Sequence, residues 1–201
     1  YPHLIPLDQP DQRVYLRFDQ ALKSEHLSAI AYSAGRLIVG TESGKLFSTT
    51  SVPVVDTNSD ALGVQRKDFG FDFPVDSLIE IPQQHISAIK SIVAHSDGET
   101  LLTLAAEPLV HIWKADTSAP SGFRHGIRLI GTTKNISHAA FLSDPSHVLA
   151  ISEDARSIVW DSVRHSQRQR VSRVMADGTT PANYDAPAVS IVPCDDNRHA
   201  I

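Results

Sequence analysis

The sequence predicts an all-β fold assembled from repeated units of short strands. Three observations lead to this prediction. Short apolar runs rich in β-branched residues recur along the 201-residue chain, bounded by Gly, Asp, Ser and Pro. Ten glycines and twelve prolines are spread along the chain, which favours turns over long helices. A pentapeptide also returns at nearly even intervals.

The repeated motif sets the expected organisation of the chain. His26–Ile30 (HLSAI) returns as His85–Ile89 (HISAI), and looser versions begin at Asn135 and Asp185. Each copy is followed by an apolar stretch, a turn and a second apolar stretch. We therefore expect structural units beginning near residues 26, 85, 135 and 185, the last being incomplete.

Each unit is expected to contain three strands joined by hairpins. These are 27–32, 36–41 and 45–47 in the first unit, 86–94, 100–105 and 109–113 in the second, and 136–142, 147–152 and 157–160 in the third. A fourth, outer strand is expected in the connecting segments, at 14–18 before the first unit and at 128–130 before the third. The segment 50–81 is expected to hold an outer strand and a long loop.

Units of this kind predict a β-propeller, in which four-stranded blades surround an axis. We expect residues 1–201 to form a partial propeller of about three complete four-stranded blades plus the start of a fourth, with an insertion or long outer segment at about 50–81. A propeller closes with typically four to eight blades. The remaining blades are therefore expected from the parent chain or from a partner subunit.

The ends of the units resemble WD40 repeats. In the third unit Asp154 stands six residues before Trp160, which is followed by an Asp. The second unit is similar, with Glu107 six residues before Trp113, whereas the first carries Thr49 where Trp is expected. By these residues the chain resembles the WD40-repeat β-propeller family.

This resemblance implies a structural network that holds blades together. It joins a His before the first strand, a Ser or Thr on the second, an acidic residue in the following turn and a Trp on the third. The candidates are His85, Thr103, Glu107 and Trp113 in the second unit, and Ser152, Asp154 and Trp160 in the third, where Asn135 replaces the His.

The resemblance also implies a non-catalytic protein-interaction scaffold, a subunit or domain of a larger intracellular, cytoplasmic assembly with other proteins as partners. Residues 152–174 and 185–189 resemble the C-terminal propeller of BEACH-domain trafficking proteins, which implies a role in membrane trafficking. The single Cys194 excludes an internal disulfide and favours a reducing compartment. No apolar run approaches the roughly 20 residues of a transmembrane helix, although peripheral membrane association stays open.

Catalytic motifs are absent from the sequence. It contains no HExxH, P-loop or Gly-x-Ser-x-Gly pattern. We interpret His85, His95 and His111 as residues that cap turns or satisfy buried polar groups, and expect no catalytic residue, metal or cofactor. A propeller enzyme or lectin is the alternative from another class.

Two further segments each have two interpretations. Arg164, Arg168, Arg170 and Arg173 form either a site for an anion, phospholipid or RNA, or a solvated outer strand; the net charge of −5 makes nucleic acid the weaker choice. Phe69, Phe71 and Phe73 form either an aromatic anchor for a partner or a stripe that packs on its own blade.

Overall fold

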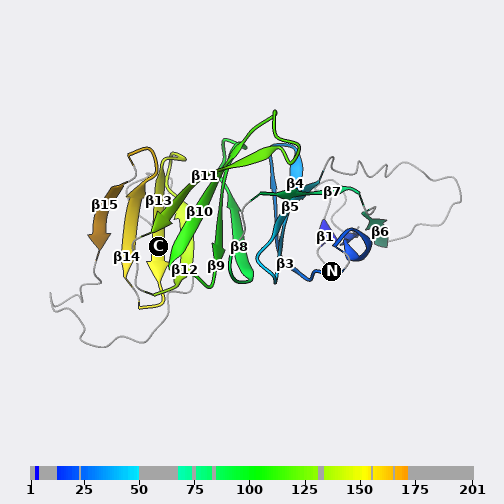
Figure 1. Ribbon diagram of the computed structural model, residues 1–201, viewed down its shortest axis with the longest axis horizontal. Helices are drawn as coiled ribbons and strands as arrows, with labels where there is room; N and C mark the ends of the chain where they lie inside the picture. Colours follow the sequence, from blue (N-terminus) through cyan, green and yellow to red (C-terminus); the bar gives the residue numbers. More distant parts are fainter. Residues whose placement is uncertain are drawn as a thin grey trace, which may run out of the picture.

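The fold is all-β, as the sequence predicts. The computed structural model describes residues 3–4, 13–22, 24–49, 68–73, 76–82, 85–130, 134–154, 156–164 and 166–171. Three four-stranded antiparallel sheets follow one another along the chain, and a three-stranded sheet formed by β1, β2 and β6 lies beside the first of them (Figure 1). Within these residues the one helix is the short α1 (Asp19–Leu22), and no helix is long and apolar enough to cross a membrane.

The first four-stranded sheet has the order β3-β4-β5-β7. It consists of β3 (Leu27–Ser33), β4 (Arg36–Thr41), β5 (Leu46–Thr49) and β7 (Leu78–Ile81). Ala34 and Gly35 take positive φ angles of 51° and 73° in the tight turn between β3 and β4. The outer strand expected within 50–81 is β7.

The second and third sheets repeat this meander. The second consists of β8 (Ile89–Ala94), β9 (Thr100–Ala105), β10 (Leu109–Ala115) and β11 (Phe123–Ile130). The third consists of β12 (Ile136–Phe141), β13 (His147–Ser152), β14 (Ser157–Asp161) and β15 (Ser166–Val171). The fourth unit expected near 185 lies outside the described residues.

A β-bulge near the start of the first strand of each four-stranded sheet shows which residues of the three sheets are structurally equivalent. The register shifts after Leu27 in β3, after Ile89 in β8 and after Ile136 in β12. His85 therefore precedes its strand by four residues, whereas His26 and Asn135 each precede theirs by one. Aligning His26–Ile30 with His85–Ile89 therefore placed the start of β8 three residues too early. Ile86, which was expected in the strand, lies before it and is 92% exposed.

Sheets that are neighbours in the chain pack against each other through apolar faces. Ile38, Leu46 and Ile81 of the first sheet meet Leu101 and Trp113 of the second in one apolar cluster. A second cluster joins the other face of the second sheet to the third. It contains Leu102, Leu104, Val110, Ile112 and Leu129 of the second sheet and Ile136, Val148, Ile158 and Trp160 of the third. The sheets are thus stacked face to face, with alternate residues of a strand serving opposite junctions.

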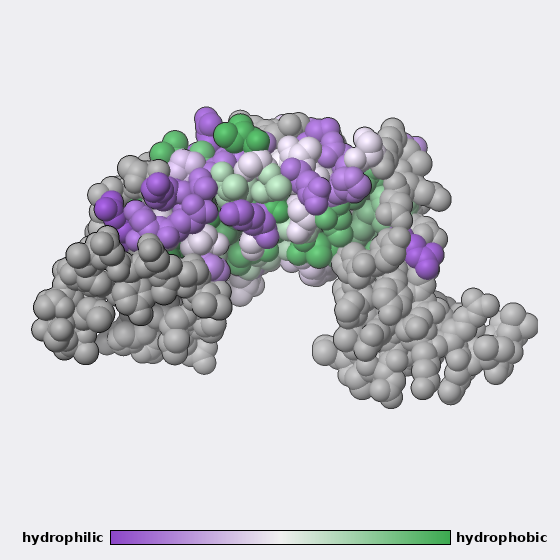
Figure 2. All heavy atoms as spheres, turned by 90° about the horizontal axis from the view of Figure 1, so that it is seen from below, coloured by the Kyte–Doolittle hydropathy of each residue, from purple (hydrophilic) through white to green (hydrophobic). Residues whose placement is uncertain are grey.

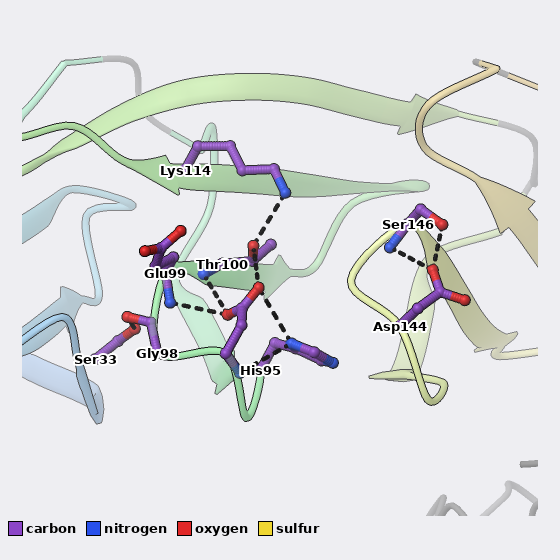
Figure 3. A network of polar contacts seen from close by, with 9 residues as sticks. Ser33, His95, Gly98, Glu99, Thr100, Lys114, Asp144 and Ser146 are labelled. Carbon is purple, nitrogen blue, oxygen red and sulfur yellow. Dashed lines mark hydrogen bonds and ion pairs between the residues drawn. The ribbon is translucent and has the colours of Figure 1, made fainter.

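The hairpins between first and second strands reinforce these junctions. Ser33 Oγ donates a hydrogen bond to the Gly98 carbonyl at 2.9 Å, joining the hairpins of the first and second sheets (Figure 3). The His95 ring contacts the Phe141 ring edge-on at 5.3 Å, at the junction of the second and third sheets. Seen from below, hydrophilic side chains cover much of the described surface, and hydrophobic ones gather along its lower edge and at points on its upper edge (Figure 2).

The N-terminal sheet corrects one prediction. It has β1 (His3–Leu4), β2 (Arg13–Arg17) and β6 (Asp68–Asp72), and β2 pairs with β6 in parallel. The segment 14–18 was expected as the outer strand of a four-stranded unit, but it belongs to this separate sheet. A local strand pattern does not identify the pairing partner, which here comes from residues far along the chain.

Candidate functional site

A buried polar cluster in the second sheet is the candidate site. His85, Thr103 and Glu107 are each at most 3% exposed, and Trp113 is fully buried. Trp113 Nε1 donates a hydrogen bond to Thr103 Oγ1 at 2.9 Å, and Thr103 Oγ1 lies 2.7 Å from His85 Nε2. His85 Nδ1 lies 3.4 Å from Glu107 Oε1. The structure thus brings together all four residues that the sequence proposed for this unit.

The local fold explains how these residues meet. Thr103 lies on β9 opposite His111 of β10, and Trp113 follows two residues later on the same face of β10. Glu107 lies in the turn between β9 and β10, where Oε1 accepts hydrogen bonds from the Ile86 and Ser87 amides at 2.6 and 3.2 Å. The carboxylate therefore holds the backbone of Ile86 and Ser87, the two residues that follow His85, against the turn between β9 and β10.

The cluster also reaches the first sheet. The His85 amide donates to the Gly44 carbonyl at 3.0 Å. Gly44 has a φ of +88°, and a Cβ placed on it would come within 2.4 Å of the His85 carbonyl oxygen and 2.8 Å of the Ser87 carbonyl oxygen. Only glycine fits this close approach of two backbones.

Two more histidines extend the cluster and were not assigned to it from the sequence. His111 is 3% exposed, and its ring lies 4.3 Å from that of His85 and 5.7 Å from that of Trp113, centroid to centroid. His111 Nδ1 lies 3.0 Å from Nε2 of His125 on β11. The i, i+2 spacing of His111 and Trp113 on a strand was the available signal, because it places both side chains on one face.

Burial keeps these imidazoles uncharged at neutral pH. Desolvation lowers the pKa of His85 against the opposing effect of Glu107. Desolvation, aided by His85, His125 and Arg128, lowers the pKa of His111 to about 3. The pKa of His125 is lowered by desolvation and then by Arg128. A neutral imidazole is the form that accepts a hydrogen bond or binds a metal ion.

The third sheet lacks the same network, which corrects part of the proposal for that unit. Ser152 Oγ donates to Asp154 Oδ1 and to the Arg156 carbonyl, so these two residues form a turn rather than a bond to Trp160. The buried Trp160 Nε1 has no hydrogen-bond partner among the described residues. Strand register explains this, because Trp160 pairs with Val148 as Trp113 pairs with Leu101, so Ala150 occupies the place of Thr103.

Asn135 is likewise not the counterpart of His85. Its amide donates to the Glu153 carboxylate at 3.2 and 3.3 Å on an exposed part of the sheet. The residue four positions before β12 is residue 132, which lies outside the described residues. His95, in contrast, caps its turn, since its Nδ1 accepts a hydrogen bond from the Asp97 amide at 3.1 Å.

The basic and aromatic candidates lie apart from this cluster. Arg164, with a side chain 72% exposed, is 3.8 Å from Asp161 after β14; Arg168 and Arg170 lie on the edge strand β15, and Arg173 lies outside the described residues. Phe69 and Phe71 lie on β6. Phe73 is 1% exposed and stacks on Phe18 with centroids 4.3 Å apart, so it packs on its own chain and is not an exposed anchor.

A cavity of about 400 Å³ opens beside the cluster. It lies between the outer strand β7 and the segment that leads into β11, and its lining includes Glu80, Phe123, Arg124 and His125. His125 therefore faces the cavity while its Nε2 contacts His111.

The geometry defines an all-β protein of stacked four-stranded antiparallel sheets, and solved structures share this arrangement. Among 965 matching chains is the crystal structure of the computationally designed Ika8 protein, with a TM-score of 0.54 and 15% identity over 84% of this chain. This chain spans 40% of the length of the designed protein. At such identity the likeness concerns the fold alone. No protein-family model matches the chain, and no curated protein matches it.

Proposed function

We propose that this chain is part of a WD40-type β-propeller that serves as a non-catalytic scaffold for protein assembly. The observation that carries this proposal is the chain of contacts Trp113–Thr103–His85–Glu107, buried where two four-stranded sheets meet. This is the arrangement that the WD40 resemblance implies. The three successive sheets of one topology support the same assignment.

The exposed surface fits a binding role. Ile86 is 92% exposed beside the anchored His85, and Tyr32 and Ile130 are each at least 60% exposed. Large apolar side chains on loops and strand ends are typical anchors for partner proteins. Because a fold does not fix a function, these side chains are the part of the proposal to test.

Further blades complete the proposed ring. Val148, Ala150 and Ile158 of the third sheet pack against the second, whereas the alternate residues Leu149, Ile151 and Val159 are only half-buried. A face with this composition is suited to receive another sheet. The ring would then close through blades of the parent chain or of a partner subunit.

Comparative capture of partners tests the scaffold. The intact protein, Ile86→Glu and Val163→Glu would be crosslinked in cells and purified, and crosslinked residues would be mapped by mass spectrometry. Val163→Glu is the matched control, since Val163 follows a third strand and therefore lies at the opposite end of the sheets from the start of β8. We expect a stoichiometric protein partner that Ile86→Glu loses and Val163→Glu keeps. Purification of the intact protein with no stoichiometric partner would contradict the scaffold.

A further inference from the structure

Three side chains of the buried cluster offer metal-ligand atoms at short range. One ligand atom each from His85, Glu107 and His111 lies within 4.8 Å of the other two. The His85 and Glu107 side chains are 0% and 4% exposed, and His111 is 3% exposed. Two imidazoles and a carboxylate thus converge in the interior, beside the Thr103 hydroxyl and the apolar cluster that contains Trp113.

The packing of the sheets does not require His111. The corresponding position two residues before Trp160 is Ile158, which packs in the apolar junction of the third sheet. In the first sheet the position two residues before Thr49 is Phe47. Replacing a buried apolar side chain by an imidazole carries a desolvation cost. The second sheet accepts this cost at His111, which is 3% exposed.

His85 supplies a second, independent observation. Its Nε2 is held by Thr103 at 2.7 Å, which fixes the orientation of the ring. Its Nδ1 points toward Glu107 at 3.4 Å and makes no hydrogen bond among the described residues. A buried imidazole nitrogen that faces a carboxylate in this way is positioned to bind a metal ion together with that carboxylate.

We propose that His85, Glu107 and His111 bind a divalent transition-metal ion of the Zn²⁺ class, with His125 as a positioning residue. Zn²⁺ takes imidazole nitrogen and carboxylate oxygen ligands at about 2.0–2.2 Å, so its tetrahedral ligands lie roughly 3.4 Å apart. Small rotations of the side chains would close the present separation to this value. Three protein ligands leave the fourth position for water.

His125 supports this site in two ways. Its contact with His111 Nδ1 at 3.0 Å orients the His111 ring, as outer-shell partners do for metal-binding histidines. It also lines the cavity of about 400 Å³, so this second contact of His111 faces the outside of the sheets. The bound ion would lock the turn of Glu107 to the residues before β8. This inference shares His85 and Glu107 with the network that supports the scaffold proposal, but zinc binding and partner capture are separate measurements, so either can fail without the other.

Zinc titration of the whole chain tests the site. After treatment with a chelator and dialysis, ZnCl₂ binding would be measured by calorimetry, and the midpoint of thermal unfolding would be followed as zinc is added. We expect one ion per chain and a midpoint that rises with zinc concentration. Substituting Co²⁺ should give the strong visible absorption of a four-coordinate ion. Absence of stoichiometric zinc binding by the folded protein would overturn the proposal.

Variants locate the ion. His111→Ile installs the residue that the third sheet carries at this position, so folding should be retained, as circular dichroism would verify. Its zinc affinity should fall at least tenfold, and that of Glu107→Gln likewise. His125→Leu should lose about 10–100-fold, the usual effect of an outer-shell partner. His26→Gln, a histidine of the first sheet, is the control and should bind as the original protein does. Equal affinity of His111→Ile and the original protein would overturn the assignment.

Discussion

The second and third sheets bury tryptophans at the same place in the meander, but they treat the indole nitrogen differently. Trp113 donates to Thr103 and enters a network that reaches Glu107, whereas Trp160 packs among apolar side chains with no hydrogen-bond partner in the described part of the chain. Both rings are at most 2% exposed. Apolar packing is thus enough to place the ring, and the polar network is an addition specific to one junction.

Comparison of the two sheets shows what the hydrogen-bond network around Trp113 contributes. In the second sheet it fixes a turn and the residues before the first strand, and the adjoining His85 amide extends the connection to Gly44 of the first sheet. In the third sheet Asp154 instead binds Ser152 within its own turn. The following predictions test this contrast, from the largest expected effect to the smallest.

Cutting the connection at Gly44 should have the largest effect. Gly44→Ala places a Cβ against two backbone carbonyls at a positive φ, so we expect the free energy of unfolding to fall by about 3 kcal/mol or more. Gly35→Ala is the control, because its φ is +73° but nothing lies within 4 Å of the added Cβ. That substitution should cost only about 1 kcal/mol. Equal losses in urea denaturation would show that the close contact with His85 is unimportant.

Breaking the network at its centre should cost less. Thr103→Ala leaves Trp113 Nε1 and His85 Nε2 without their partner, so the free energy of unfolding should fall by about 2–3 kcal/mol. Ser48→Ala, at a buried hydroxyl bonded to a single carbonyl of Ser121, should cost about 1 kcal/mol. Urea denaturation measures both, and a Thr103→Ala loss no larger than that of Ser48→Ala would contradict the network.

Acidification should selectively weaken the junction between the first and second four-stranded sheets. Burial lowers the pKa of His85, His111 and His125, that of His111 from 6.5 to about 3. As the pH falls through about 6.5, the unfolded chain therefore binds protons that the folded chain does not, and the free energy of unfolding decreases toward pH 3. His111→Ile should flatten this dependence, since Ile158 serves at the matching position. Thermal unfolding in a chelating buffer at several pH values measures it, and identical slopes would refute it.

Giving Trp160 Nε1 a hydrogen-bond acceptor should stabilise the third sheet. Ala150→Ser places a hydroxyl where Thr103 stands in the second sheet, within reach of Trp160 Nε1. We expect a gain of about 1 kcal/mol in the free energy of unfolding. The same change in Trp160→Phe, which has no indole N–H, is the control and should bring no gain. A gain of equal size in both backgrounds would mean that the hydroxyl does not act through the indole.

The smallest effect is expected on the edge strand. Arg168→Glu and Arg170→Glu on β15 should change the free energy of unfolding by less than about 0.5 kcal/mol. If the strand is simply solvated, binding to RNA or to vesicles containing anionic lipid should also stay unchanged in a sedimentation assay. A loss of binding in the double variant would instead establish the anion-binding alternative.

Much of the fold could be predicted from the sequence, because hairpins leave local signals. Alternating apolar residues and turn residues identified most strands of the three sheets, including an outer strand before Pro82. The pairing of β2 with β6 could not be found, since it joins distant segments in parallel. The HISAI motif placed the start of β8 three residues too early. Ile86 and Ile89 are equally apolar, and only the bulge shows that the strand begins at Ile89.

The candidate site was predicted only in part. His85, Thr103, Glu107 and Trp113 were recognisable by their order within one unit. The histidine pair on β10 and β11 was not, because the contact of His111 with His125 depends on a register shift between Ile112 and Trp113 that sequence patterns do not reveal.

The face-to-face stacking has a consequence for how the protein comes apart. Each sheet touches only its neighbours, so the free energy of the array is close to a sum of sheet terms and junction terms. The second sheet is covered on both faces, and its β9 is buried throughout. In this chain without the proposed further blades, opening should therefore begin at the first and third sheets, so that the amides of β9 exchange with solvent last.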